Sequence, residues 1–227
     1  MDIFVAILVA LLAAGIAYAT LDISICSKVR VLRPSDPERE YESINLSRVH
    51  AASLSILVAL LSFFAMYRIM QTVSNAIGIC KMMIALLCMT GAACVDFREK
   101  RIPNIFPLVM AVAGIVLLAL GVITQQSGAF AYVTSSFVSA IVCVVLFFIA
   151  SALTHQGIGA GDIKLIGALA IVTGMVAVIG TIFYGIAACS VIAVIALLTK
   201  KMSLKQSLPF GPFLFIGYIV TVLTGNF

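Results

Sequence analysis

Long apolar runs, separated by short polar segments, make up most of this chain. A membrane-spanning helix needs about 20 apolar residues, whereas a membrane β-strand shows a shorter, alternating pattern. The pattern therefore predicts an all-α, polytopic membrane bundle of about eight transmembrane helices. The continuous runs lie at about residues 3–21, 49–68, 76–95, 103–123, 130–153 and 208–226.

The apolar stretch from Leu165 to Thr199 is too long for a single crossing. We expect two short helices there, joined by a turn near Gly174 to Gly180. A single helix would also carry the basic segment that follows it to the side opposite most other basic residues.

Composition agrees with a membrane protein and excludes a soluble domain. Hydrophobic residues make up 63% of the chain and charged residues only 10%, and the mean hydropathy is +1.22. The six cysteines form no CxxC pair, so they indicate neither a metal site nor a disulfide framework. We expect the lipid bilayer as a partner, no nucleic acid, and no metal or other cofactor.

The basic residues predict the orientation. All but two of the 14 Lys and Arg residues lie in the segments 22–48, 96–102, 154–164 and 199–207. These segments share one side if the N-terminus lies outside, and the positive-inside rule makes that side cytoplasmic. The other two, Arg68 and Lys81, then lie near the outer face, where long side chains can reach the interface.

Two regions are distinguished along the chain. Residues 1–75 form an N-terminal two-span region with the cytoplasmic loop 22–48, and residues 76–227 form a membrane core. Both belong to a single membrane domain.

Acidic residues are scarce in the membrane core. Outside Asp2 and the first loop, the chain has only Asp96, Glu99 and Asp162. Asp96 ends one predicted span and Asp162 begins another, and the predicted topology places both at the cytoplasmic end of the membrane. Such a pair can act as an aspartyl dyad, in which one carboxylate takes a proton from water and the other protonates a scissile carbonyl. Alternatively, Asp96 is an interfacial residue and Asp162 a helix cap.

The segment GIGAGD contains three glycines before Asp162, namely Gly157, Gly159 and Gly161. Glycine permits unusual backbone angles and the close approach of another chain. An extended substrate could therefore lie against this bare backbone. The alternative is an ordinary flexible loop.

Three segments together resemble the type IV prepilin peptidase family of GxGD membrane aspartyl proteases. They are DFREKRIPN, GAGDIKL and PFGPFLFIGY, and the resemblance extends over about residues 76–227. It implies that Asp96 and Asp162 are the catalytic pair. It also implies a supporting motif made of Gly159, Gly161, Lys164, Pro103 and Asn104.

The same resemblance implies a reaction. It is the cleavage of short basic leader peptides from type IV pilin-like precursors, at the cytoplasmic face of a prokaryotic cell membrane. The long form of the family carries paired CxxC motifs after its first span and also N-methylates its product. Because the first loop here has one cysteine, Cys26, the chain resembles the compact, peptidase-only form. N-methyltransferase activity is therefore doubtful.

Two charged features have two interpretations each. Lys164 either interacts electrostatically with a nearby carboxylate or marks the cytoplasmic side. The acidic residues of the first loop either guide a basic leader to the site or balance the arginines of their own loop. These residues are Asp36, Glu38, Glu40 and Glu42.

Two other classes of protein stay open. An ion- or proton-coupled transporter also uses acidic residues within the membrane, and a non-catalytic scaffold needs no paired acids. Against a transporter, the ionisable residues cluster at one predicted face, and no inverted repeat is visible. The sequence leaves open which precursor is cut, the oligomeric state and the distance between the two aspartates.

Overall fold

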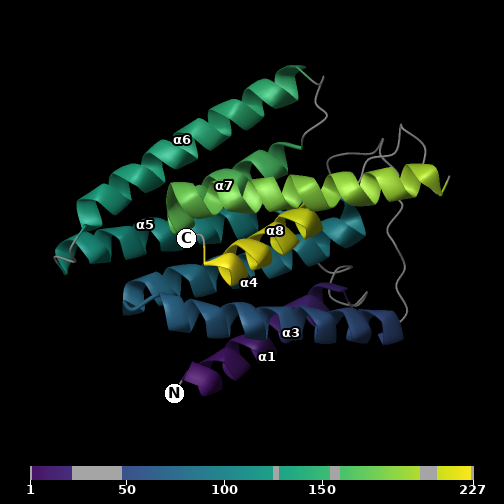
Figure 1. The fold of residues 1–227 in the computed structure, drawn as a ribbon, viewed down its shortest axis with the longest axis horizontal. Helices are drawn as coiled ribbons and strands as arrows, with labels where there is room; N and C mark the ends of the chain where they lie inside the picture. The colour runs from purple at the N-terminus through teal and green to yellow at the C-terminus, as the bar shows by residue number, and fades with distance from the viewer. Residues whose placement is uncertain (1, 22–47, 125–127, 154–158, 200–208, 226–227) are drawn as a thin grey trace.

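The computed structural model describes residues 2–21, 48–124, 128–153, 159–199 and 209–225. These residues form seven helices and no strand (Figure 1). Six are long and apolar enough to cross a membrane, and the seventh, α8, is a shorter apolar helix. The predicted all-α membrane bundle is thus confirmed. The helices are α1 (Asp2–Leu21), α3 (Arg48–Thr72), α4 (Ala76–Glu99), α5 (Ile105–Ile123), α6 (Ala129–Leu153), α7 (Ala160–Leu198) and α8 (Gly211–Thr224).

Helix α7 is broken at Gly174, where the predicted turn begins. Gly174 has φ 79° and ψ −175°, a backbone conformation that is essentially restricted to glycine. The break divides α7 into an N-terminal arm, residues 160–173, and a C-terminal arm, residues 175–198. With the arms counted separately, the described residues contain eight helical segments, as the apolar pattern predicted.

The C-terminal arm of α7 packs against α8 and runs in the opposite direction. Gly180 lies against Thr221, near the end of α8, whereas Gly185 lies against Phe213 and Leu214, near its beginning. The two segments are therefore antiparallel, and the ribbon reverses direction at the break (Figure 1). As a result, the start of α7 and the last part of its C-terminal arm both lie toward the end of the bundle where α8 begins.

Two side chains, from α6 and α4, lie at the break. The Tyr132 hydroxyl, from α6, donates a hydrogen bond of 3.0 Å to the carbonyl oxygen of Val172. The Lys81 ammonium lies 4.1 Å from the centre of the Tyr132 ring. We expected Lys81 to reach the interface, and this was wrong, because the side chain is only 7% exposed. The aromatic ring gives the buried ammonium a partner through a cation–π contact.

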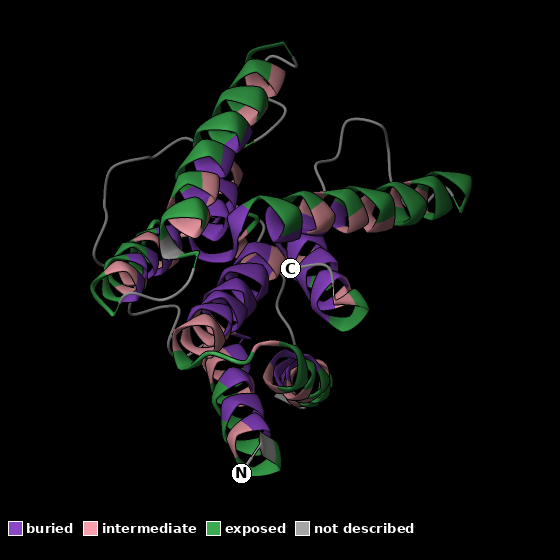
Figure 2. Cartoon of the chain, turned by 60° about the vertical axis from the view of Figure 1, so that its left-hand side comes forward, coloured by how far each residue is buried: buried purple, intermediate pink, exposed green. Residues whose placement is uncertain are grey.

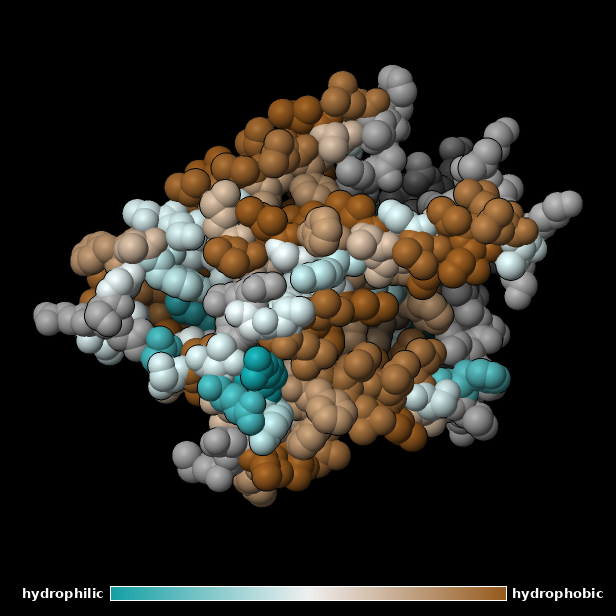
Figure 3. All heavy atoms as spheres, in the orientation of Figure 1, coloured by the Kyte–Doolittle hydropathy of each residue, from teal (hydrophilic) through white to brown (hydrophobic). Residues whose placement is uncertain are grey.

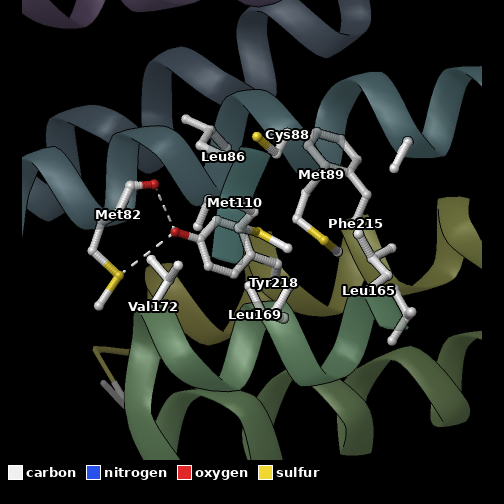
Figure 4. Packing of buried hydrophobic residues seen from close by; sticks show 14 of the residues in the cluster. Met82, Leu86, Cys88, Met89, Met110, Leu165, Leu169, Val172, Phe215 and Tyr218 are labelled. Carbon is white, nitrogen blue, oxygen red and sulfur yellow. Dashed lines mark hydrogen bonds between the residues drawn. The ribbon is translucent and has the colours of Figure 1, made fainter. Parts of the chain in front are cut away.

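The core lies between α4, α8 and the N-terminal arm of α7. Tyr218 of α8 is fully buried, and its hydroxyl donates to the Met82 carbonyl of α4 at 3.0 Å. Around it pack Leu86 and Met89 of α4 and Leu169 of α7 (Figure 4). Figure 2 shows the same division, with α4 and α8 mostly buried and the outer helices mostly exposed.

The outer surface is apolar. Hydrophobic residues cover most of the face shown in Figure 3, and the few strongly hydrophilic ones lie toward the left and right of the view. The exposed side chains of α5 and α6 include Ile105, Val112, Phe137 and Phe148. Because lipid is as apolar as these side chains, the surface suits a bilayer rather than water.

Candidate active site

Asp96 lies in the last turn of α4 and is held by the beginning of α8. Its side chain is only 5% exposed. Its Oδ2 atom accepts a hydrogen bond of 2.7 Å from the backbone N–H of Gly211, the first residue of α8. The first N–H groups of a helix have no acceptor within that helix, and the N-terminus favours a negative charge. The carboxylate therefore provides the acceptor that this end of α8 lacks.

Gly211 is glycine because Asp96 leaves no room for a side chain. A Cβ atom on Gly211 would lie 2.9 Å from the Asp96 Cβ and 2.9 Å from its Oδ2. The sequence marked this segment only as a glycine-proline helix start. The contact with Asp96, 115 residues away, was missed because no local pattern reveals it.

Asp162 lies in the first turn of α7 and faces the same region. Its backbone N–H donates to the Gly159 carbonyl at 3.0 Å, and Gly159 is the N-cap residue. Helix α7 packs against α4, the helix that carries Asp96. The Asp162 Oδ1 atom is buried and has no hydrogen-bond partner among the described residues. A buried carboxylate oxygen of this kind is available to a shared proton, a water molecule or a substrate.

The glycines before Asp162 have different surroundings. A Cβ on Gly161 would lie 3.1 Å from the Cβ of Ile102 and 3.3 Å from its carbonyl oxygen. Ile102 therefore covers Gly161, and the predicted bare backbone is not available there. Gly159 is exposed, and a Cβ on it would lie 3.0 Å from the Asp162 Oδ2. Gly157 lies outside the described residues.

Lys164 is joined to the segment before α5. Its ammonium donates to Oδ1 of Asn104 at 3.2 Å, and both side chains are exposed. Pro103 precedes Asn104, and its carbonyl accepts from the backbone N–H of Phe106 at 3.3 Å. These contacts bring two of the predicted motif segments together, although they are 60 residues apart in the sequence.

Other predicted residues lie at the same end or outside the described residues. Glu99 is the last residue of α4, one turn after Asp96. The buried Arg98 donates to the Leu21 carbonyl at 3.3 Å and so joins the ends of α4 and α1. No group of three or more His, Cys, Asp or Glu residues that could hold a metal ion occurs in the part of the chain that the structure describes. The acidic loop residues, Asp36, Glu38, Glu40 and Glu42, lie outside that part.

Comparisons with known proteins relate the chain to one family of membrane peptidases. Residues 82–194, which contain both aspartates, match the type IV leader peptidase family. The chain is 33% identical over 76 residues to the prepilin leader peptidase/N-methyltransferase of Bacillus subtilis (strain 168). That alignment spans 34% of this chain and only 31% of the relative. No solved structure matches the chain significantly.

Proposed function

Because the chain belongs to the type IV leader peptidase family, we propose that it is an aspartic endopeptidase of the membrane. Its substrates are type IV pilin-like precursors, and it removes their short basic leader peptides at the cytoplasmic face of the cell membrane. The family match and the apolar helices support a multi-pass membrane peptidase. The substrate, the catalytic pair and the orientation are our proposal.

One observation carries the assignment of the catalytic pair. Asp96 and Asp162 come from two different helices, α4 and α7, which pack against each other. Asp96 is fixed by Gly211, whereas Asp162 has a buried oxygen with no partner among the described residues. Two groups of the same kind in different hydrogen-bonding environments are suited to opposite proton-transfer roles.

The proposed mechanism uses these two environments. One carboxylate accepts a proton from water as the water attacks the scissile carbonyl, and the other donates a proton to the carbonyl oxygen. The proton taken from water then passes to the leaving amine as the C–N bond breaks, and the proton on the former carbonyl oxygen returns to the second carboxylate, which completes hydrolysis. We include no methyl transfer, because the relative named for both activities is aligned over less than a third of its length.

Substitution of each aspartate tests the proposal. Asp96→Asn and Asp162→Asn keep the size of the side chain but remove its acid–base function. We expect each to lower cleavage of a purified pilin-like precursor by at least about 10²-fold, the lower range for loss of general acid–base catalysis. Precursor and product are separated by gel electrophoresis or mass spectrometry.

Glu99→Gln is the matched control, since it removes a carboxylate from the same helix end. We expect this variant to keep most of the wild-type rate. If both Asp→Asn variants cleave as fast as wild type, the proposed pair is wrong. If the wild-type protein cleaves no such precursor, a transporter or a scaffold becomes the better interpretation.

A further inference from the structure

We propose that residues 100–104, which connect α4 to α5, act as a brace that sets the separation of Asp96 and Asp162. The hydrogen bond between Lys164 and Asn104 closes this brace. The inference deepens the proposed function, because it assigns positioning residues to the same site. It rests on three contacts along five consecutive residues.

The first contact fixes the brace to the helix of Asp96. Lys100 ends α4 in the left-handed conformation, with φ 50° and ψ 35°, and its backbone N–H donates to the Asp96 carbonyl at 2.8 Å. A left-handed residue at the end of a helix turns the chain sharply away from the helix axis. The brace therefore starts at a defined point, one turn after Asp96.

The second contact is between the middle of the brace and the residue that precedes Asp162. Ile102 is buried, 7% exposed, and its Cβ and carbonyl oxygen lie against the bare face of Gly161. A side chain at position 161 would force the brace and α7 apart. The glycine in the GAGD segment thus serves the close approach of another part of the same chain.

The third contact is on the other side of Asp162. Asn104 accepts the hydrogen bond from Lys164, two residues after Asp162. Residues two apart on a helix do not face each other, so Lys164 is directed away from the face that carries the Asp162 carboxylate. Its effect on the reaction therefore passes through Asn104 and the brace.

Together the contacts fix the residue before Asp162 and the residue two positions after it. They connect both to the helix end that carries Asp96 through one short segment. Catalysis by a pair of carboxylates depends strongly on their geometry, because a misplacement of about 1 Å can lower a rate by about 10²-fold. Lys164 and Asn104 are accordingly positioning residues, and they do not need to touch the substrate.

Kinetic measurements test the role of the polar contact. We expect Asn104→Leu and Lys164→Met each to lower kcat about tenfold with little change in KM, and the double variant to be no slower than either single variant. Asn104→Asp keeps the acceptor and should retain wild-type kcat within about threefold. Arg68→Met, which removes an exposed cation near the other end of the bundle, is the matched control and should have no effect.

A direct electrostatic role of Lys164 gives a different result. Asn104→Leu would then leave kcat unchanged while Lys164→Met lowered it, and the brace would be wrong. Equal losses in Asn104→Asp and Asn104→Leu would also contradict it, because the acceptor would then be irrelevant.

Thiol accessibility gives a readout that does not depend on peptidase activity. Ile102→Cys is introduced alone into a chain whose six native cysteines are replaced by alanine, and the rate of its reaction with a water-soluble maleimide is measured in detergent. We expect slow labelling, because position 102 is buried against Gly161, and a rate about tenfold faster when Asn104→Leu or Lys164→Met is added. If neither substitution changes the labelling rate, the brace is overturned. If labelling responds as expected but the wild-type protein cleaves no precursor, the proposed function fails and the brace stands.

Discussion

At the scale of single residues, Gly211 is closely confined by the Asp96 side chain. Its N–H binds the Asp96 carboxylate, and its missing side chain leaves space for the same group. Both properties depend on the beginning of α8 lying directly against the end of α4. A small change at this position therefore acts directly on a proposed catalytic group.

We predict that Gly211→Ala lowers the cleavage rate by about 10²-fold, because the added methyl group displaces the Asp96 carboxylate. Global stability should change much less, since α8 can keep its helical hydrogen bonds. The measurements are precursor cleavage and thermal unfolding in detergent.

Gly15→Ala is the control, because a Cβ there would meet nothing within 4 Å. This variant should be as active as wild type. Wild-type activity in Gly211→Ala would show that the Asp96 carboxylate does not need its position against α8.

The sequence drew attention to the two acids of the candidate site more readily than to the residues that surround them. Asp96 and Asp162 were conspicuous because carboxylates are scarce in an apolar chain. The contacts of Gly211 with Asp96 and of Ile102 with Gly161 join segments that are far apart, and no periodicity relates them. Lys81 was misplaced for the same reason, because its aromatic partner Tyr132 comes from another helix.

At the scale of elements, apolar run length predicted the helices but not their ends. Helix α4 was expected to end near residue 95, yet it continues to Glu99. Asp96 and Arg98 can lie within the extended helix because each finds a partner at the end of another helix. Asp96 binds the N–H of Gly211, and Arg98 binds the carbonyl of Leu21.

The break in α7 is the element-level feature on which the site depends most. A continuous helix of 39 residues would be about 58 Å long, nearly twice the hydrocarbon thickness of a bilayer. It would also carry the C-terminal arm, and α8 after it, away from Asp96. The reversal at Gly174 therefore brings the start of α8 to the same end as the start of α7.

We predict that Gly174→Ala destabilises the fold by about 1–3 kcal/mol, the range for a residue forced into a rare backbone conformation. Chemical unfolding in mixed micelles measures the change in the free energy of unfolding, with Gly15→Ala as the control. An unchanged stability would mean that the chain can turn at this point without the glycine conformation.

At the scale of the whole molecule, five helix ends meet around the two aspartates. The ends of α1 and α4 are joined by Arg98, the start of α8 binds Asp96, and the starts of α5 and α7 are joined by Lys164 and Asn104. The cations Arg98, Lys100 and Lys164 lie at this end. From the positive-inside rule, we propose that this end faces the cytoplasm.

Two matched threonines test this orientation. Thr124 and Thr199 both follow a helix, are exposed, and donate to a carbonyl four residues earlier. In a chain without other cysteines, we expect Thr124→Cys to react with a membrane-impermeant maleimide in intact cells. Thr199→Cys should react only after the membrane is opened. Labelling of Thr199→Cys from outside would contradict the reversal of α7 or the orientation.

The conformation of Gly174 also makes the fold depend on chirality at one position. The mirror image of its backbone angles, φ −79° and ψ 175°, lies in the extended region that every L-residue adopts easily. A Cβ in the L position would make only ordinary contacts, 3.6 Å from the Tyr132 ring, so size is not the obstacle. D-alanine, introduced by chemical synthesis, would therefore carry none of the backbone strain that L-alanine does. At this turn, the membrane bundle requires either a D-residue or glycine, which is achiral.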